Sequence, residues 1–129
     1  MSVRIVRLGS PRAKDEGTRI GTVRRPPRGV PRSEFASQDW YDVWFPTLAP
    51  SVETMKLGQA ATTPAQWAAF LRKVRAELAA PPASHALELL AELSKRTNFS
   101  VGCYCETEAR CHRSVLRELL RAKGAQVES

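Results

Sequence analysis

Residues near the carboxyl end of the chain combine several side chains that can do chemistry. The stretch CYCETEARCHR, residues 103–113, holds all three cysteines, one of the two histidines, and several acidic and basic groups. These residue types favour three kinds of site: an anion-binding site with acid–base chemistry, a metal site, or a reactive-cysteine site. A corner in which the cysteines only pack as small apolar side chains is the remaining interpretation.

The anion-binding interpretation depends on a helix that we expect over residues 112–123. Its N-terminus would present unpaired backbone N–H groups to a negatively charged ligand. Three side chains beside that N-terminus add hydrogen-bond donors: Arg110, Arg113 and Ser114. Glu106 and His112 are the catalytic candidates, because a carboxylate at a strand end can act as acid or base and an imidazole titrates near neutral pH. We favour this interpretation of the segment.

A zinc site is the alternative for the same residues. Its four ligands would be Cys103, Cys105, Cys111 and His112. The spacing Cys-x-Cys-x5-Cys-His differs from the paired Cys-x-x-Cys arrangement of structural zinc sites. Cys111 and His112 are also adjacent, so their side chains would diverge by about 100° on a helix. We therefore expect no metal cofactor and keep zinc as the alternative.

Cysteine chemistry is the third possibility, with Cys105 and Cys111 as structural or reactive thiols. Cys111 stands beside arginines at a predicted helix N-terminus, an environment that lowers a thiol pKa. The Cys-x5-Arg motif of tyrosine phosphatases is absent, because the sixth residue after Cys105 is Cys111. An odd number of cysteines within nine residues argues against a disulfide framework. We expect reduced thiols.

The net charge of +7 is concentrated in the first quarter of the chain. Residues 1–32 carry nine basic and two acidic side chains, whereas the remaining residues are balanced. The segment RRPPRGVPR, residues 24–32, has three prolines and one glycine, which predict a stiff loop that holds its arginines apart. Arg24, Arg25 and Arg28 would form the wall of a cationic pocket. Its partner would be an anionic small molecule or nucleic acid.

The elements that position these residues follow from apolar patterning. Strands are predicted over residues 3–8 and 18–23, and an apolar run over residues 97–105 predicts a strand buried on both faces. Helices are predicted after the capping residues Ser51 and Thr63, from Ser84 onward, and over residues 112–123. We expect the aromatic segment 35–51 to be largely buried, and its residues 39–45 are compatible with a strand or a helical turn.

This order of elements predicts a small single α/β domain over residues 1–129. Its sheet would be mostly parallel and flanked by helices. In such sheets ligands bind at the carboxyl ends of the strands, which is where Cys105, Glu106 and the loop to His112 would lie. The chain has no run of about 18 apolar residues and no apolar leader, so we expect a cytoplasmic protein that does not enter membranes. Oligomeric state does not follow from these features.

Three landmarks in the sequence resemble those of a known family. They are GTRIGTVRRPPRGV, then WFPTLAPSVET followed by WAAFLRKVRAEL, and finally SVGCYCETEARCHRSVLRELL. Over about residues 3–123 the chain resembles the YeaO-like proteins of the domain-of-unknown-function 488 group. The broader group carries a Cys-Glu…Cys-His-Arg signature that many YeaO-like members lack. In this sequence it corresponds to Cys105, Glu106, Cys111, His112 and Arg113.

The sequence departs from the family in the arginine loop. The family typically reads Arg-Leu-Trp-Pro-Arg-Gly there, and this chain has Arg25-Pro26 where the family has Leu-Trp. The resemblance implies a small α/β domain in the bacterial cytoplasm. It implies no particular activity.

Overall fold

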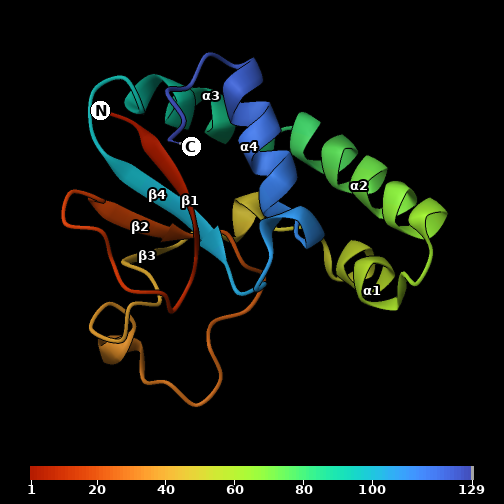
Figure 1. Cartoon of the computed structure of the whole chain (residues 1–129), viewed down its shortest axis with the longest axis horizontal. Coiled ribbons are helices and arrows are strands. Elements are labelled where there is room, and N and C mark those ends of the chain that lie inside the picture. Colours follow the sequence, from red (N-terminus) through yellow and green to blue (C-terminus); the bar gives the residue numbers. More distant parts are fainter. Residues whose placement is uncertain (129) are drawn as a thin grey trace.

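The centre of the fold is a four-stranded, entirely parallel sheet (Figure 1). The computed structural model describes residues 1–128, apart from the side chain of Ala109. The strands are β1 (Val3–Arg7), β2 (Thr18–Gly21), β3 (Val43–Trp44) and β4 (Phe99–Cys103), and they lie in the order β1-β4-β2-β3. The predicted α/β class with a parallel sheet is confirmed.

Strand β4 occupies the position between β1 and β2. Its residues pair with β1 from Val3–Phe99 to Arg7–Cys103, and with β2 from Thr18–Phe99 to Gly21–Gly102. All five residues of β4 are buried, as the apolar run without strict alternation predicted. Gly102 is required in this strand, because a Cβ atom there would lie 2.6 Å from the carbonyl oxygen of Val6.

Four α-helices follow the patterns of capping residues and apolar spacing, with one correction. They are α1 (Val52–Ala60), α2 (Pro64–Ala79), α3 (Ala83–Leu93) and α4 (Arg113–Ala122). The predicted caps at Ser51 and Thr63 are confirmed, and Thr63 forms a complete capping box with Gln66. The third helix, predicted to begin at Ser84, begins one residue earlier at Ala83, and Pro82 precedes it without a side-chain cap.

The main core lies where α2, α3 and α4 pack on one face of the sheet. Phe99 and Val101 of β4 share this core with Val74 of α2, Leu87 of α3 and Leu116 of α4. The alternate residue of β4, Ser100, points away from it and contacts the loop that precedes β2. Figure 1 shows α1 and α2 farther from the strands than α4. None of the helices in residues 1–128 has the length and apolar character needed to cross a membrane.

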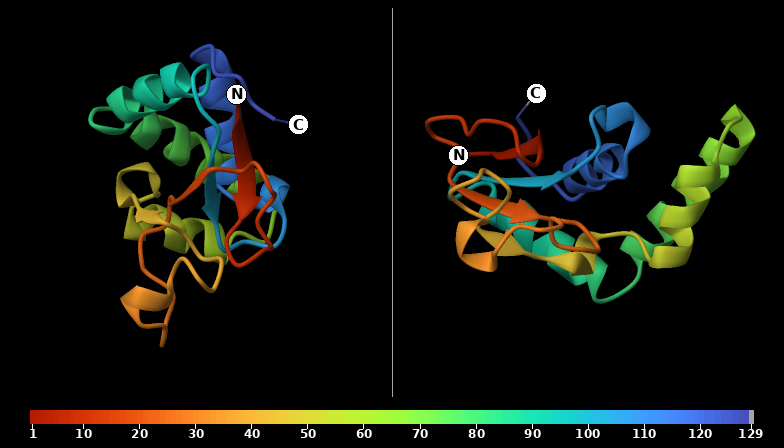
Figure 2. Two further views of the ribbon diagram at one scale, coloured as in Figure 1. Left: turned by 90° about the vertical axis from the view of Figure 1, so that its left-hand side faces the viewer. Right: turned by 90° about the horizontal axis from the view of Figure 1, so that it is seen from below.

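The aromatic segment 35–51 contains the short strand β3 and little other regular structure. One 3-10 turn, η1 (Arg32–Glu34), precedes the segment, and a second, η2 (Pro46–Leu48), follows β3 within it. The expected burial is only partly found, because Tyr41 is buried and Trp44 is 44% exposed. In Figure 1 and in the left view of Figure 2, the preceding arginine and proline segment projects away from the sheet.

Candidate functional site

A cleft of about 1190 Å³ lies at the carboxyl ends of the parallel strands. Its wall consists of the chain that follows β1, β2 and β4, namely residues 7–11, 23–28 and 103–105, with Trp40, His112 and part of α1. Ligands bind at this edge of open parallel sheets. The edge is also where the sequence predicts a site.

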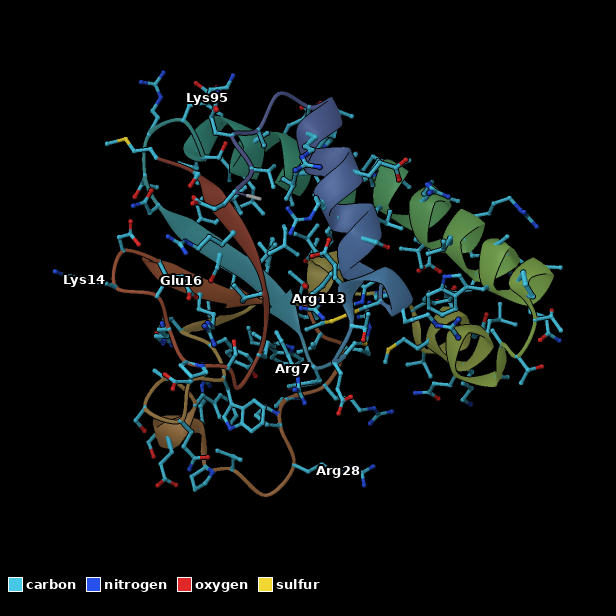
Figure 3. All side chains as sticks on the ribbon, viewed as in Figure 1. Arg7, Lys14, Glu16, Arg28, Lys95 and Arg113 are labelled. Atoms are coloured by element: carbon cyan, nitrogen blue, oxygen red, sulfur yellow. A yellow bond between two sulfur atoms is a disulfide. The ribbon has the colours of Figure 1, made fainter. Side chains whose placement is uncertain are left out.

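Four arginines line the cleft, and they are held in different ways. Arg24 is fixed to the body of the protein, because its guanidinium donates to the carbonyl oxygens of Ala49 (3.0 Å) and Pro50 (3.1 Å). Arg7 lies 3.9 Å from the exposed carboxylate of Glu106. Arg25 and Arg28 are exposed, and no acidic side chain within residues 1–128 pairs with them. Figure 3 shows Arg7 at the end of β1 and Arg28 on the projecting segment.

Two aromatic side chains form part of the same wall. The rings of Trp40 and Tyr104 meet edge to face, with centroids 5.8 Å apart. The Tyr104 hydroxyl donates a 2.9 Å hydrogen bond to the carbonyl oxygen of Arg25. Burial raises the pKa of Tyr104, so the hydroxyl keeps its proton and remains a donor. The contact joins the end of β4 to the arginine segment.

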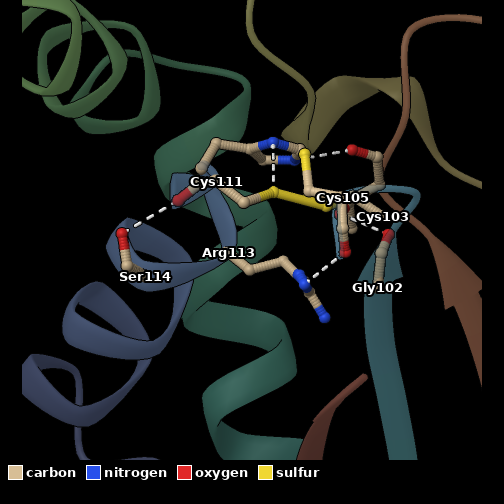
Figure 4. The surroundings of a disulfide bond; sticks show 8 residues. Gly102, Cys103, Cys105, Cys111, Arg113 and Ser114 are labelled. Atoms are coloured by element: carbon tan, nitrogen blue, oxygen red, sulfur yellow. Dashed lines mark hydrogen bonds between the residues drawn. A yellow bond between two sulfur atoms is a disulfide. The ribbon is translucent and has the colours of Figure 1, made fainter. Parts of the chain in front are cut away.

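The sulfur atoms of Cys103 and Cys111 are joined by a disulfide, and both residues are buried (Figure 4). The expectation of reduced thiols is therefore wrong for this pair. The sequence did not indicate this pairing, because it depends on η3 (Glu108–Arg110), which returns the chain so that Cys111 lies next to Cys103. Cys105 is the free cysteine.

His112 is a buried, neutral histidine whose two ring nitrogens face different partners. Its Nε2 lies 2.9 Å from the carbonyl oxygen of Thr22, and its Nδ1 lies 3.6 Å from the sulfur of Cys111. A carbonyl oxygen only accepts, so Nε2 carries the proton and Nδ1 has the lone pair. Burial lowers the pKa of His112 to about 4, a direction that the charge of Arg113 reinforces. The expectation that His112 titrates near neutral pH is wrong.

Arg113 and Cys105 form a second contact beside the disulfide. Arg113 is buried, and its guanidinium donates a 2.6 Å hydrogen bond to the carbonyl oxygen of Cys105 (Figure 4). Its Nε atom is buried without a partner among the described residues. Desolvation raises the pKa of Cys105, against the opposing effect of the Arg113 charge. A raised pKa disfavours the thiolate, which is the nucleophilic form of cysteine.

Several predicted ligand-binding residues lie outside the cleft wall. The Arg110 guanidinium stacks over the ring of Trp67, with Cζ 4.6 Å from the ring centroid. The Ser114 hydroxyl donates to the carbonyl oxygen of Cys111 at 2.9 Å. Neither residue lines the cleft, and neither does Arg113. Glu106 also lies outside the lining, with 84% of its side chain exposed. The catalytic roles of Glu106 and His112 remain predictions.

Three residues of the predicted zinc set come together, and the fourth does not. The ligand atoms of Cys103, Cys111 and His112 all lie within 4.8 Å of one another, and Cys105 is not in this group. The Cys111 and His112 side chains do not diverge, so that prediction is wrong. Cys111 has an extended backbone and His112 is the N-cap residue of α4, so the two residues are not consecutive members of one helix.

Sequence reasoning missed a buried ion pair on the opposite side of the sheet. Arg19 binds both carboxylate oxygens of Glu16, at 2.7 and 3.0 Å, and both side chains are almost fully buried. The same guanidinium donates to the carbonyl oxygens of Ser10 (2.8 Å) and Asp39 (2.7 Å). Ser100 donates to Glu16 at 2.6 Å. The available signal was an acidic residue just before the predicted strand and a basic residue three positions later within it.

Ion pairs neutralise several of the basic side chains in the first quarter of the chain. Arg4 pairs with Asp15 at 2.8 Å and Arg12 with Asp42 at 2.7 Å, in addition to the pair of Arg19 with Glu16. Their charges are compensated. The arginines at the cleft wall are therefore the main surplus of positive charge that this part of the chain presents around a cavity.

Comparison with known proteins gives one result. A family model named DUF488-N3a, described as the active DUF488-N3 subclade, matches residues 3–124. No curated protein and no solved structure matches the chain. The match confirms the domain-of-unknown-function 488 assignment predicted from the three sequence landmarks, whereas the YeaO-like subdivision stays a prediction. The chain belongs to the DUF488-N3a family, a subclade of the domain-of-unknown-function 488 group.

Proposed function

We propose that the cleft binds a nucleotide unit, that is, a ligand with a phosphate group and a planar ring. The observation that carries this proposal is that the exposed arginines Arg25 and Arg28 share one cavity wall with the aromatic pair Trp40 and Tyr104. Arginine binds phosphate oxygens through two parallel N–H donors. Aromatic side chains bind nucleobases by stacking.

The arginine segment supports phosphate binding because it is partly fixed before a ligand arrives. Pro26 and Pro27 restrict its backbone, and both line the cleft. Arg24 and Tyr104 attach the segment to the body through hydrogen bonds. A segment with less freedom loses less conformational entropy on binding.

The size and the composition of the cleft support a ligand with an apolar planar part. Its volume of about 1190 Å³ is sufficient for a nucleotide. Leu8, Val23 and Met55 line it beside the aromatic pair. A ring would therefore leave water for a mainly apolar surface, while its phosphate would remain near the arginines.

Proton transfer by Glu106 and His112 is not needed for this proposal. Glu106 is exposed outside the cleft lining, and the ring nitrogens of His112 face Thr22 and Cys111. The family model is described as an active subclade, which supports a search for turnover of any nucleotide that binds.

A thermal-shift screen tests the proposal. The probes are the common nucleoside monophosphates and diphosphates, with the matching unphosphorylated nucleosides as controls. We expect a rise in melting temperature with at least one nucleotide, and little or none with its nucleoside, because ligand binding to the folded state alone stabilises it. The absence of a shift with every nucleotide at millimolar concentration contradicts the proposal.

Free nucleotides and nucleic acids would offer the same chemistry to the cleft. Short single-stranded oligonucleotides of DNA and RNA form the second arm of the screen, at two salt concentrations. The affinity of a ligand bound through several phosphates falls steeply as the salt concentration rises, whereas the affinity of a ligand bound through a single phosphate falls only slightly. Tight, salt-sensitive binding of oligonucleotides with weak binding of mononucleotides assigns the cleft to nucleic acid.

A further inference from the structure

The cysteine and histidine cluster at the cleft wall has no part in the proposed ligand binding. We propose that, after reduction of the Cys103–Cys111 disulfide, the two thiolates and Nδ1 of His112 bind a zinc ion. This inference does not rest on the nucleotide proposal, because the metal alone tests it.

The ligand atoms already converge. The two sulfurs and a ring nitrogen of His112 lie within 4.8 Å of one another, and all three residues are buried. Thiolate sulfur and imidazole nitrogen are the ligands that zinc takes in structural and catalytic sites. The residues stand at the end of β4, after η3 and at the N-cap of α4. Rigid elements on both sides therefore hold the three ligands.

The His112 ring has the tautomer that metal binding through Nδ1 requires. Its Nε2–H donates to the carbonyl oxygen of Thr22 at 2.9 Å, so the lone pair is on Nδ1, which faces the sulfur of Cys111 at 3.6 Å. Histidines that bind metals usually donate their other ring N–H to a carbonyl or carboxylate, and this contact fixes the orientation of the ring. Thr22 provides that contact before any ion is present.

The backbone positions of the two cysteines also suit an ion between the sulfurs. Their Cα atoms are 8.0 Å apart. Disulfide-linked cysteines usually have Cα atoms about 4.4–6.8 Å apart. A bridging ion adds two metal–sulfur bonds, each about 2.3 Å long, and so accommodates a wider separation.

The fourth coordination position would open toward the cleft. Cys105 does not belong to the convergent group, so the described residues supply three ligands. Cys103 and His112 both line the cleft. Zinc with three protein ligands and one open position is the arrangement of catalytic sites, in which water or substrate takes the fourth place.

Zinc binding requires that the Cys103–Cys111 disulfide is first reduced. A phosphine or dithiol reductant gives two electrons to the disulfide, which takes up two protons and becomes two thiols. Zinc then displaces both protons as it binds the two thiolates. The oxidised protein has no thiolate at these positions and should not bind the ion.

The test uses the full chain, purified without a metal-affinity tag and reduced with a phosphine. Titration with Co²⁺ should give one equivalent of bound metal, with the visible bands of tetrahedral cobalt and a sulfur-to-cobalt charge-transfer band. Zn²⁺ should displace the cobalt and remove these bands. The oxidised protein should show neither the visible bands nor the charge-transfer band. A reduced, folded protein without these bands overturns the proposal.

Variants identify the ligands. Cys111→Ser and His112→Ala should weaken Co²⁺ binding by more than the roughly 100-fold that the loss of an outer contact costs. Cys105→Ala should keep one equivalent of bound cobalt. Retained binding in Cys111→Ser, or its loss in Cys105→Ala, contradicts the ligand set.

Alkylation of the unaltered protein avoids any effect of substitution on folding. In the reduced protein, zinc should slow the alkylation of Cys103 and Cys111 at least tenfold and leave the alkylation rate of Cys105 unchanged, as read by mass spectrometry of peptides. Equal alkylation rates with and without zinc overturn the proposal.

Discussion

The hydroxyl of Tyr104 donates a 2.9 Å hydrogen bond to the carbonyl oxygen of Arg25, and so links the residue after β4 to the arginine segment after β2. Tyr104 also contacts Trp40 edge to face. One side chain therefore holds together the cationic and the aromatic parts of the cleft. The relationship connects residues 79 positions apart in the chain.

Replacement of Tyr104 by phenylalanine tests this link. Tyr104→Phe removes the hydroxyl and keeps the ring, so the contact with Trp40 remains. We expect nucleotide affinity to fall by about fivefold, in line with about 1 kcal/mol for one hydrogen bond. The unfolding free energy should fall by no more than about 1 kcal/mol. Unchanged affinity, measured by calorimetric titration, would show that the link does not organise the cleft.

Removal of one partner of the buried Arg19–Glu16 pair should destabilise the fold strongly. Arg19→Met leaves the carboxylate of Glu16 buried without its partner, a change that costs about 3–5 kcal/mol. Arg4→Met is the matched control, because its pair with Asp15 is exposed and should contribute less than about 1 kcal/mol. Urea unfolding of the two variants measures the difference. Equal losses would contradict a special role for the buried pair.

The lowered pKa of the buried Glu16 carboxylate makes the unfolding free energy depend on pH. Burial opposes ionisation of Glu16, but hydrogen bonds from Arg19, Ser100 and the Ala13 amide outweigh it and lower its pKa from 4.5 to about 2. The unfolded chain therefore takes up the proton first as the pH falls. The stabilisation is complete above pH 4.5 and is lost as the pH falls toward 2.

The size of this loss should be about 3 kcal/mol, which corresponds to the lowering of the Glu16 pKa. Unfolding free energies between pH 6 and pH 3 should record about 2 kcal/mol of this loss, because the rest falls nearer pH 2. Glu16→Gln is the control that lacks the titrating group. The difference between the two proteins should shrink as the pH falls. A difference that is constant over this range would contradict the lowered pKa.

The fold was largely predictable from local patterns. The apolar run before Cys103 indicated a central strand, and Thr63 with Gln66 marked a helix start, because both signals depend only on neighbouring residues. The order of the strands and the short β3 were not predictable. They depend on long-range pairing between segments with weak local preferences.

The site was predicted in part. The arginine segment and the strand end do share a cleft, because the carboxyl ends of parallel strands meet at one edge. The convergence of Cys103 with Cys111, and the outward stacking of Arg110 on Trp67, depend on the turn between β4 and α4. Residue spacing alone did not specify the path of that turn.

The most direct test of the nucleotide proposal is a calorimetric comparison of three substitutions with the unaltered protein, using the nucleotide that gives the largest thermal shift. Arg25→Gln and Arg28→Gln remove the two exposed guanidinium groups of the cleft wall, and Arg72→Gln removes an exposed arginine of α2 outside it. Loss of a hydrogen bond to a charged group costs about 1.5–3 kcal/mol, so at least one cleft substitution should weaken binding by about tenfold or more. Arg72→Gln should change it less than twofold. Equal affinities in all four proteins would contradict the assignment of this cleft as the phosphate-binding site.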